Sequence, residues 1–233
     1  MGLSMNGVNL TGRTSMSAVT GNDPYFSDVT LLLHCDGADE STSFVDSSLL
    51  NQTITVSGGA EIDTTVVKYG TGSLKATGAS SYITATGGGT MFNPGVGSWT
   101  LEGWAQNSTG LNAALLSGNT NDFYLIQSGN AWIVGDGINN NMVVGYNQSA
   151  ATWFFWTLVR NAGVFTLFFD GVVALGGVSS PALKNVNITS LIISGHPPTN
   201  SYNLGYMDDI RITNGVARYT ANFTPPAAAF PNS

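Results

Sequence analysis

Pairs of carboxylates are the residues of this sequence whose spacing comes nearest to a catalytic arrangement. Retaining glycoside hydrolysis requires two carboxyl groups about 5 Å apart, and Glu61 and Asp63, at i and i+2, would share one face of a strand. No third carboxylate joins them in a regular pattern, and we expect them on a solvated sheet edge. Asp208 and Asp209 are consecutive, so a regular strand would point their side chains to opposite faces. We therefore interpret both pairs as non-catalytic.

The nucleophiles and bases of this chain are equally sparse. His34 and His196 have no serine or cysteine at a spacing that suggests a catalytic pair, so we interpret both as structural. Cys35 is the single cysteine and lies in the apolar pattern LLLHCD, without an adjacent Lys or Arg to lower its pKa. This predicts a buried, unreactive thiol, and it excludes an intrachain disulfide or a thiolate metal cluster. The sequence predicts that the protein is not an enzyme.

The composition narrows the possible partners. The formal net charge is -7, and seven Lys and Arg in 233 residues form no basic patch for nucleic acid or an anionic membrane. No apolar run approaches the roughly 20 residues of a membrane-spanning helix, and the N-terminus lacks the apolar core of a secretory signal. Ser, Thr, Asn and Gly take the place of the charged residues that usually solvate a protein surface. This composition is typical of robust extracellular β proteins. Without an export signal, such a protein would leave a cell by lysis or within a larger particle.

The elements that must position these residues are predicted to be short strands. The most apolar stretch, 153–174, contains aromatic and β-branched runs joined at Asn161-Ala162-Gly163 and again at Asp170-Gly171, which predicts a three-stranded meander. Similar runs recur about every 8 to 12 residues, which is the spacing typical of β-sandwiches. No segment combines the 3.6-residue hydrophobic periodicity of a helix with capping residues at its ends. Outside the meander we expect strands at 29–36, 54–56, 62–67, 81–85, 98–106, 113–117, 123–127, 131–134, 142–146, 189–194 and 206–213.

These patterns predict an all-β fold with one domain. Asn22-Asp23-Pro24 marks a turn where the compact domain, 23–233, would begin. Residues 1–22 carry Gly, Ser, Thr and Asn with scattered Leu, Val and Met, which indicates either an extended arm that docks on a partner or a disordered tail.

Trp104 is the first candidate for binding a ligand. In SWTLEGWAQ, residues 98–106, alternation places Trp99 and Leu101 on a core face and Glu102 and Trp104 on the opposite face. A tryptophan among polar neighbours is typical of a platform on which a sugar ring stacks. The alternative is that Trp104 packs beneath a loop on the same sheet.

Five segments together resemble a known family. They are LLLHCDGAD at 31–39, KYGTGSLKATGASSYIT at 68–84, WTLEGWAQ at 99–106, WTLVRNAGVFTLFFDGVV at 156–173 and YMDDIRITNGVARYTANFTPP at 206–226. The chain resembles the laminin-G-like branch of the concanavalin A-like lectin/glucanase superfamily, in the form found in virion proteins of tailed bacteriophages. The last segment is the most specific of the five.

This resemblance implies a jelly-roll sandwich of two curved antiparallel sheets. It also implies a calcium site formed by a late aspartate and backbone carbonyls, for which Asp36 and Asp208 are the positions that match. The alternative for Asp208, together with Arg211, is a role in packing or in a salt bridge.

The resemblance also implies a function. The expected protein is a bacteriophage virion structural protein, a head decoration or tail-surface protein, made in the host cytoplasm and carried on the particle. Residues 1–22 would anchor it to the major capsid or tail protein, and a homo-oligomer, with a trimer favoured, is expected by association. The alternative is a carbohydrate-binding adhesion module for host-surface glycans, and a glycan hydrolase is third. In the alternative, the glycan-binding residues would be Trp104, Tyr124, Trp132 and Tyr146.

Overall fold

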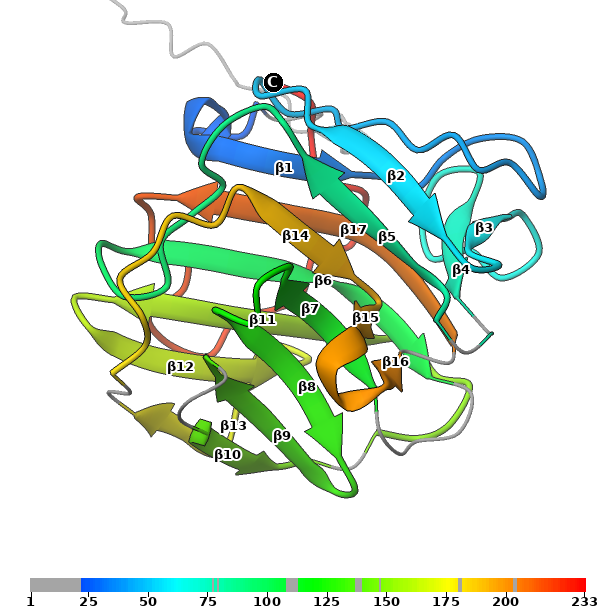
Figure 1. Ribbon diagram of the computed structural model, residues 1–233. Coiled ribbons are helices and arrows are strands. Elements are labelled where there is room, and N and C mark those ends of the chain that lie inside the picture. Colours follow the sequence, from blue (N-terminus) through cyan, green and yellow to red (C-terminus); the bar gives the residue numbers. More distant parts are fainter. Residues whose placement is uncertain are drawn as a thin grey trace, which may run out of the picture.

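The chain folds into antiparallel strands that form two sheets packed face to face (Figure 1). The computed structural model describes residues 22–76, 78, 80–107, 113–136, 140–146, 148–179, 182–202 and 205–233. The expectation of an all-β sandwich is confirmed. The described helical segments are two 3-10 turns, η1 (Phe26–Asp28) and η2 (Pro197–Thr199), and no helix among the described residues is long and apolar enough to cross a membrane.

The first sheet carries the long strands of the domain. In spatial order it contains β3 (Glu61–Asp63), β4 (Ser73–Ala76), β17 (Gly205–Asn214), β6 (Trp99–Asn107), β11 (Phe154–Asn161), β12 (Val164–Phe169) and β13 (Val172–Ser179), and β1 (Val29–Leu33) pairs with the same edge of β17 as β4 does. The predicted meander over 153–174 is confirmed as β11, β12 and the start of β13. Its first turn places Ala162 and Gly163 at φ +49° and +89°, as a two-residue hairpin loop requires.

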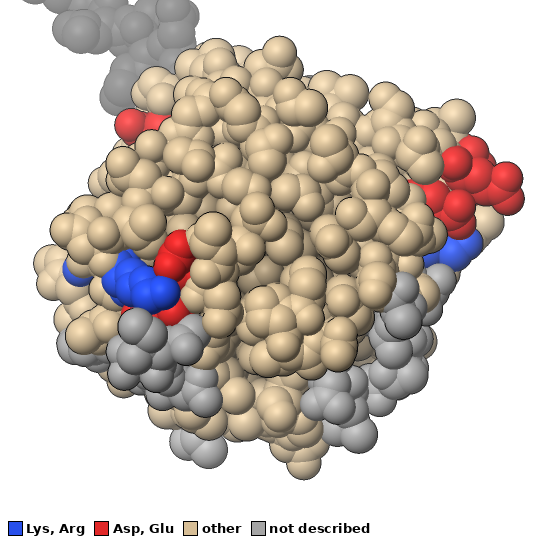
Figure 2. Space-filling view, viewed as in Figure 1, with Lys and Arg blue, Asp and Glu red and all other residues tan. Residues whose placement is uncertain are grey.

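The second sheet faces the viewer in Figure 1. Its order is β2 (Thr53–Ser57), β5 (Tyr82–Thr86), β14 (Ser190–Ile193), β7 (Ala114–Gly118), β8 (Tyr124–Ser128), β9 (Ala131–Gly135) and β10 (Asn140–Gly145). Figure 2 shows charged side chains on the left and right sides of this view, with uncharged atoms across its centre. A small hairpin of β15 (Gly195–His196) and β16 (Ser201–Tyr202) lies beside β7. Gly145 of β10 also pairs with Leu175 of β13, so the two sheets are joined along this edge.

The core between the sheets is rich in aromatic rings. Trp99 packs edge to face against Phe92, Phe123 and Phe165, with ring centroids 5.3, 6.1 and 5.4 Å away. These side chains are fully buried, and each aromatic pair adds about 0.5 to 1.5 kcal/mol beyond the area that it buries. Cys35 is a buried free cysteine, and burial raises the pKa of its thiol well above the usual value, which confirms the sequence-based interpretation.

The outer face of the first sheet is covered by the C-terminal segment, residues 215–233. Phe230 packs there with Leu32 of β1, Trp104 of β6 and Phe155 of β11, and Phe223 joins the same cluster. This cover could not be predicted from a periodic pattern, because the segment forms no strand and carries only separate aromatic residues.

A buried ion cluster fastens this segment and the start of the domain to the sheet. Glu102 Oε1 accepts hydrogen bonds from Arg211 Nε and Nη2 at 2.9 and 2.7 Å. Asp23 accepts hydrogen bonds from Arg211 and from Arg218 at 2.6 to 2.9 Å. Burial alone would raise the pKa of Asp23, but the hydrogen bonds from Arg218 and the Tyr25 N–H, with the charges of both arginines, outweigh burial and lower that pKa. The salt-bridge role that we weighed for Arg211 is the one observed.

The two ends of the domain meet. The N–H of Asp23 donates a hydrogen bond of 2.6 Å to the carbonyl of Ser233, and the hydroxyl of Ser233 contacts Asn22 Oδ1 at 3.3 Å. Figure 1 shows the C-terminus at the top, beyond β1, while β10 and β13 lie at the bottom. The predicted arm over 1–22 lies outside the described residues except for Asn22.

Several predicted strands differ from the observed ones. Val66 and Val67 lie in a bend after β3, because Asp63 Oδ1 accepts a hydrogen bond from the Val66 N–H and turns the chain. The strand β4, which begins at Ser73 directly after a glycine-rich stretch, was not among the predicted strands. The short strands β15 and β16 were not predicted either, because two residues are too few to show alternation.

Candidate ligand-binding site

A pocket of about 500 Å³ opens where the two sheets are joined. Asn130, Gly145, Tyr146, Phe169 and residues 172–174 line it. They come from the β8–β9 turn, the end of β10 and the β12–β13 turn, all of which meet at the β10–β13 edge. Gly145 adds no side chain to the wall, and a Cβ atom there would have no heavy atom within 4 Å. The volume is within the range of small-molecule sites.

Two stacked aromatic rings form one wall of this pocket. The rings of Tyr146 and Phe169 are nearly parallel, at 11°, with centroids 3.9 Å apart. Phe169 is buried and Tyr146 is half-buried, so the tyrosine is the partly accessible member of the pair. Burial, and then the charge of Asp170, raises the pKa of the Tyr146 hydroxyl, which therefore remains a neutral hydrogen-bond donor and acceptor at physiological pH.

Asp170 places a carboxylate at the edge of the pocket. Its Oδ2 accepts a hydrogen bond of 3.1 Å from the Tyr146 hydroxyl, and its Oδ1 accepts one of 2.9 Å from the N–H of Phe155. Asp170 is exposed and adopts φ +50°, a left-handed conformation that Asp tolerates better than most residues. Gly171 follows at φ +75°, where a Cβ atom would lie 1.9 Å from the carbonyl oxygen of Phe223. The turn is therefore fixed by backbone contacts.

This combination of groups suits the binding of a ring that carries hydroxyl groups. An aromatic face can stack on the apolar side of a ring, while the phenol, the carboxylate and the Asn130 amide can exchange hydrogen bonds with hydroxyl groups. The described lining residues include no Ser, Cys, His or Lys that could act as a nucleophile or general base.

Trp104 does not offer a free ring face. It is only 6% exposed, the Lys68 ammonium lies 3.7 Å from its ring centroid, and Tyr69 and Phe155 pack against it with centroids 5.9 and 5.1 Å away. Alternation correctly placed Trp104 on the outer face of the sheet, but the loop around Lys68 covers it. We therefore remove Trp104 from the candidate site.

The other three predicted aromatic residues lie in different places. Trp132 is fully buried between the sheets, with Phe169 5.3 Å away, so it offers no ring face to a sugar. Tyr124 is 6% exposed on the outer face of β8 and packs against His196 at 4.9 Å. Of the four, Tyr146 is the one that lines the pocket.

The two residues predicted to bind calcium hold one loop. Asp208 Oδ2 accepts a hydrogen bond of 2.9 Å from the N–H of Lys68, and Asp36 Oδ1 accepts hydrogen bonds from the N–H and the hydroxyl of Thr71. Among the described residues, no three His, Cys, Asp or Glu side chains gather as a metal site would require. These two carboxylates could supply only part of the six to eight oxygens that calcium needs. Calcium at these positions stays a prediction.

We had expected Asp208 and Asp209 to point to opposite faces of the sheet. The structure shows that they do not. A β-bulge interrupts the pairing of β17 with β6, and Asp209 adopts φ +48°. Asp208 therefore bonds the N–H of Tyr69, and Asp209 bonds the N–H of Phe230, both within the outer cluster. Burial, with a contribution from the neighbouring charge of Asp209, raises the pKa of Asp208 to about 7.

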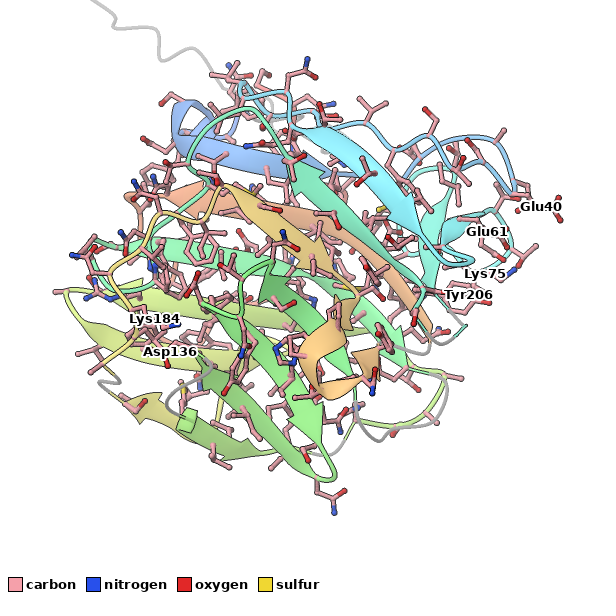
Figure 3. All side chains as sticks on the ribbon, viewed as in Figure 1. Glu40, Glu61, Lys75, Asp136, Lys184 and Tyr206 are labelled. Carbon is pink, nitrogen blue, oxygen red and sulfur yellow. The ribbon has the colours of Figure 1, made fainter. Side chains whose placement is uncertain are left out.

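The remaining candidate groups are engaged in contacts within the domain. Glu61 and Asp63 lie on the edge strand β3 and both contact the Lys75 ammonium, at 2.8 and 3.6 Å; Figure 3 shows Glu61 and Lys75 at the right-hand margin, away from β10 and β13. His34 bridges Asp209 and Asn232, at 2.7 Å from each. His196, similarly, lies between Thr199 and Asn121.

Sequence reasoning missed Asn130 and the valine wall of the pocket. Val172 is 55% exposed although it lies in a strand of apolar residues. An apolar residue directly after the predicted Asp170-Gly171 turn was the available signal, but nothing in the sequence shows that β13 reaches β10 across the sandwich edge.

Fold and site together define an all-β sandwich with an aromatic-lined pocket of about 500 Å³ at the edge where its two sheets join. No family profile and no curated protein sequence matches the chain. Among solved structures, the binding domain of botulinum neurotoxin serotype D is similar, with TM-score 0.62 and 15% identity over 82% of this chain and 49% of that one. The serotype G binding domain gives TM-score 0.58 and 17% identity over 81% and 48%. The binding domain of neurotoxin DC in complex with rat synaptotagmin II gives 0.56 and 14%, again over 81% and 48%.

The chain thus spans about half the length of these binding domains. At such low identity the similarity establishes the fold alone. It supports the two-sheet sandwich, and it names neither a laminin-G-like protein nor a bacteriophage protein.

Proposed function

We propose that this chain is a non-catalytic binding module that holds a glycan in the pocket beside Tyr146. The observation that carries this proposal is the stacked Tyr146–Phe169 pair with a phenol, a carboxylate and an amide around an open pocket. A sugar ring has an apolar side for stacking and hydroxyl groups for the polar atoms, so it matches both halves of the arrangement. The similar solved structures are receptor-binding domains rather than catalytic ones, which supports a binding role on this fold.

The particle on which this module is displayed is the subject of a second proposal, supported by a different observation. We infer that the module is displayed on a bacteriophage virion, as a head decoration or tail-surface protein of the laminin-G-like kind, because the segments at 31–39 and 206–226 resemble those virion proteins. The start and the end of the described chain lie together at the end of the domain opposite the pocket. A module anchored through residues 1–22 to a capsid or tail protein, as a trimer, would therefore present the pocket outward to host-surface glycans.

The binding proposal is tested by screening the full-length protein on a glycan array. We expect the wild type to bind a set of glycans and Tyr146→Ala to bind them at least about fivefold more weakly, because one stacked ring is worth about 1 kcal/mol or more. Tyr82→Ala is the matched control, since Tyr82 is also half-buried and stacks on another tyrosine, Tyr202, with centroids 6.2 Å apart. Absence of binding by the wild type to every glycan would refute the proposal.

The proposed display on a virion is tested by deleting residues 1–21. This deletion keeps Asn22 and its contact with Ser233. Loss of particle attachment, with an unchanged thermal unfolding curve of the isolated protein, supports the anchor. Attachment at the wild-type level would contradict it.

A further inference from the structure

Asp170 places a negative charge beside the pocket, because its carboxylate contacts the hydroxyl of the lining residue Tyr146. The described lining residues are an amide, a phenol, a phenyl ring, valines, an alanine and a glycine, none of them charged. Asp170 lies between Phe169 and Val172 in the chain, and its carboxylate contacts the Tyr146 hydroxyl. A ligand that stacks on Tyr146 would therefore lie beside this carboxylate.

The carboxylate is held in place by its own turn. Both Asp170 Oδ1 and its backbone N–H bond to Phe155, at 2.9 and 2.8 Å, and the left-handed turn cannot relax because Gly171 touches the backbone of Phe223. Rotating the carboxylate away from a ligand would break the Phe155 bond. Since an ionised carboxylate only accepts hydrogen bonds, it favours ligand hydroxyl or amine donors.

No described cation neutralises this carboxylate by direct contact. Among the described residues, no Lys or Arg forms an ion pair with Asp170. The charge of Asp170 acts on the pKa of Lys68, but the Lys68 ammonium lies over the Trp104 ring, 3.7 Å from its centroid, and not against the Asp170 carboxylate. The net charge of -7 gives the whole protein a negative electrostatic potential, which also repels anions.

We propose that the pocket selects uncharged glycans and rejects sialylated, sulfated or phosphorylated ones, with Asp170 as the residue that determines this specificity. This inference rests on the proposed function and adds the chemical class of the ligand. Asp170 contributes to specificity in two ways: it accepts a hydrogen bond from a ligand hydroxyl, and it repels an anionic substituent placed on the same ring. Because Asp170 is exposed, the repulsion is partly screened and falls as the ionic strength rises.

The test uses pairs of oligosaccharides that differ only by one sulfate or one terminal sialic acid. With the full-length wild type at low salt, we expect the anionic member to bind about tenfold more weakly than the neutral one, as for like charges several ångströms apart in a partly screened site. The ratio should fall toward about twofold at 1 M NaCl, where the screening length is about 3 Å.

Asp170→Asn is the informative variant. Asn tolerates the left-handed conformation and keeps an oxygen for the Phe155 N–H, so the turn should be retained. We expect the neutral-to-anionic ratio to fall to about twofold in this variant at low salt. Glu40→Gln is the control, since it removes the same unit of charge from an exposed site at the opposite margin (Figure 3) and should leave the ratio unchanged.

Failure of this inference and failure of the proposed binding function would give different results. Equal binding of neutral and anionic members by the wild type, or a ratio unchanged by Asp170→Asn, overturns the inference while the proposed binding function stands. Binding of neither member of any pair overturns both.

Discussion

The buried ion cluster under the C-terminal segment makes a quantitative prediction about stability. Glu102 is fully buried, and its two oxygens accept hydrogen bonds from Arg211 and from the Tyr219 hydroxyl at 2.7 to 2.9 Å. Glu102→Gln keeps the shape and an accepting oxygen but removes the charge. Two arginines, Arg211 and Arg218, would then share the single carboxylate of Asp23 in a buried site.

The expected cost follows from that imbalance. Removing one partner of a buried ion pair costs about 3 to 5 kcal/mol, and the hydrogen bonds that Gln retains place this variant near the lower end, about 3 kcal/mol. Domains of this kind have about 5 to 15 kcal/mol of stability in total. A loss of about 3 kcal/mol corresponds to a fall of about 6 to 12 °C in Tm for a chain of this size.

The assay is urea unfolding followed by tryptophan fluorescence. Glu61→Gln is the matched control, because it removes the same charge from a half-exposed pair with Lys75 and should cost less than about 1 kcal/mol. If Glu102→Gln lowers the free energy of unfolding no more than Glu61→Gln does, the cluster does not hold the segment to the sheet and the reasoning fails.

Three further predictions concern pH, the pocket turn and calcium. Because the pKa of Asp23 is lowered on folding, its contribution is present above the unfolded value of about 4 and is lost as the pH falls through the folded pKa. Asp23→Asn should therefore destabilise the protein at pH 7, and the difference from the wild type should shrink as the pH falls below about 4 in acid titrations of unfolding. Gly171→Ala should cost at least about 2 kcal/mol more than Gly129→Ala in thermal unfolding, because both have positive φ but a Cβ atom meets Phe223 only at Gly171; equal costs would contradict the fixed turn. If Asp36 and Asp208 bind calcium, Tm should rise when excess Ca²⁺ replaces a chelator, and an unchanged Tm would remove that prediction.

Much of the sandwich could be predicted from local patterns. Aromatic and β-branched runs between turns located β6, β11 and β12 within about one or two residues, because alternation and turn chemistry act locally. The bulge at Asp208 and Asp209 could not be predicted, since a local break in the pleat leaves the sequence pattern looking regular.

The candidate site was harder to predict than the strands. Alternation gives the face on which a side chain lies, but not what covers that face. Trp104 and Trp132 were therefore proposed as glycan platforms although Lys68 covers one and the opposite sheet covers the other. Tyr146 was identified from its aromatic character in a turn-rich region, whereas its partner Phe169 lies in another hairpin, and only the fold brings the two together.

The most direct test of the central claim is to map where a bound glycan lies on the protein. Backbone amide resonances of the isotope-labelled full-length chain would be followed while a neutral glycan identified on the array is added. The account predicts that the shifts concentrate at Asn130, Gly145, Tyr146 and residues 169–174. Shifts concentrated on another surface, such as the Thr53–Ser57 edge strand, with the pocket resonances unchanged, would contradict it.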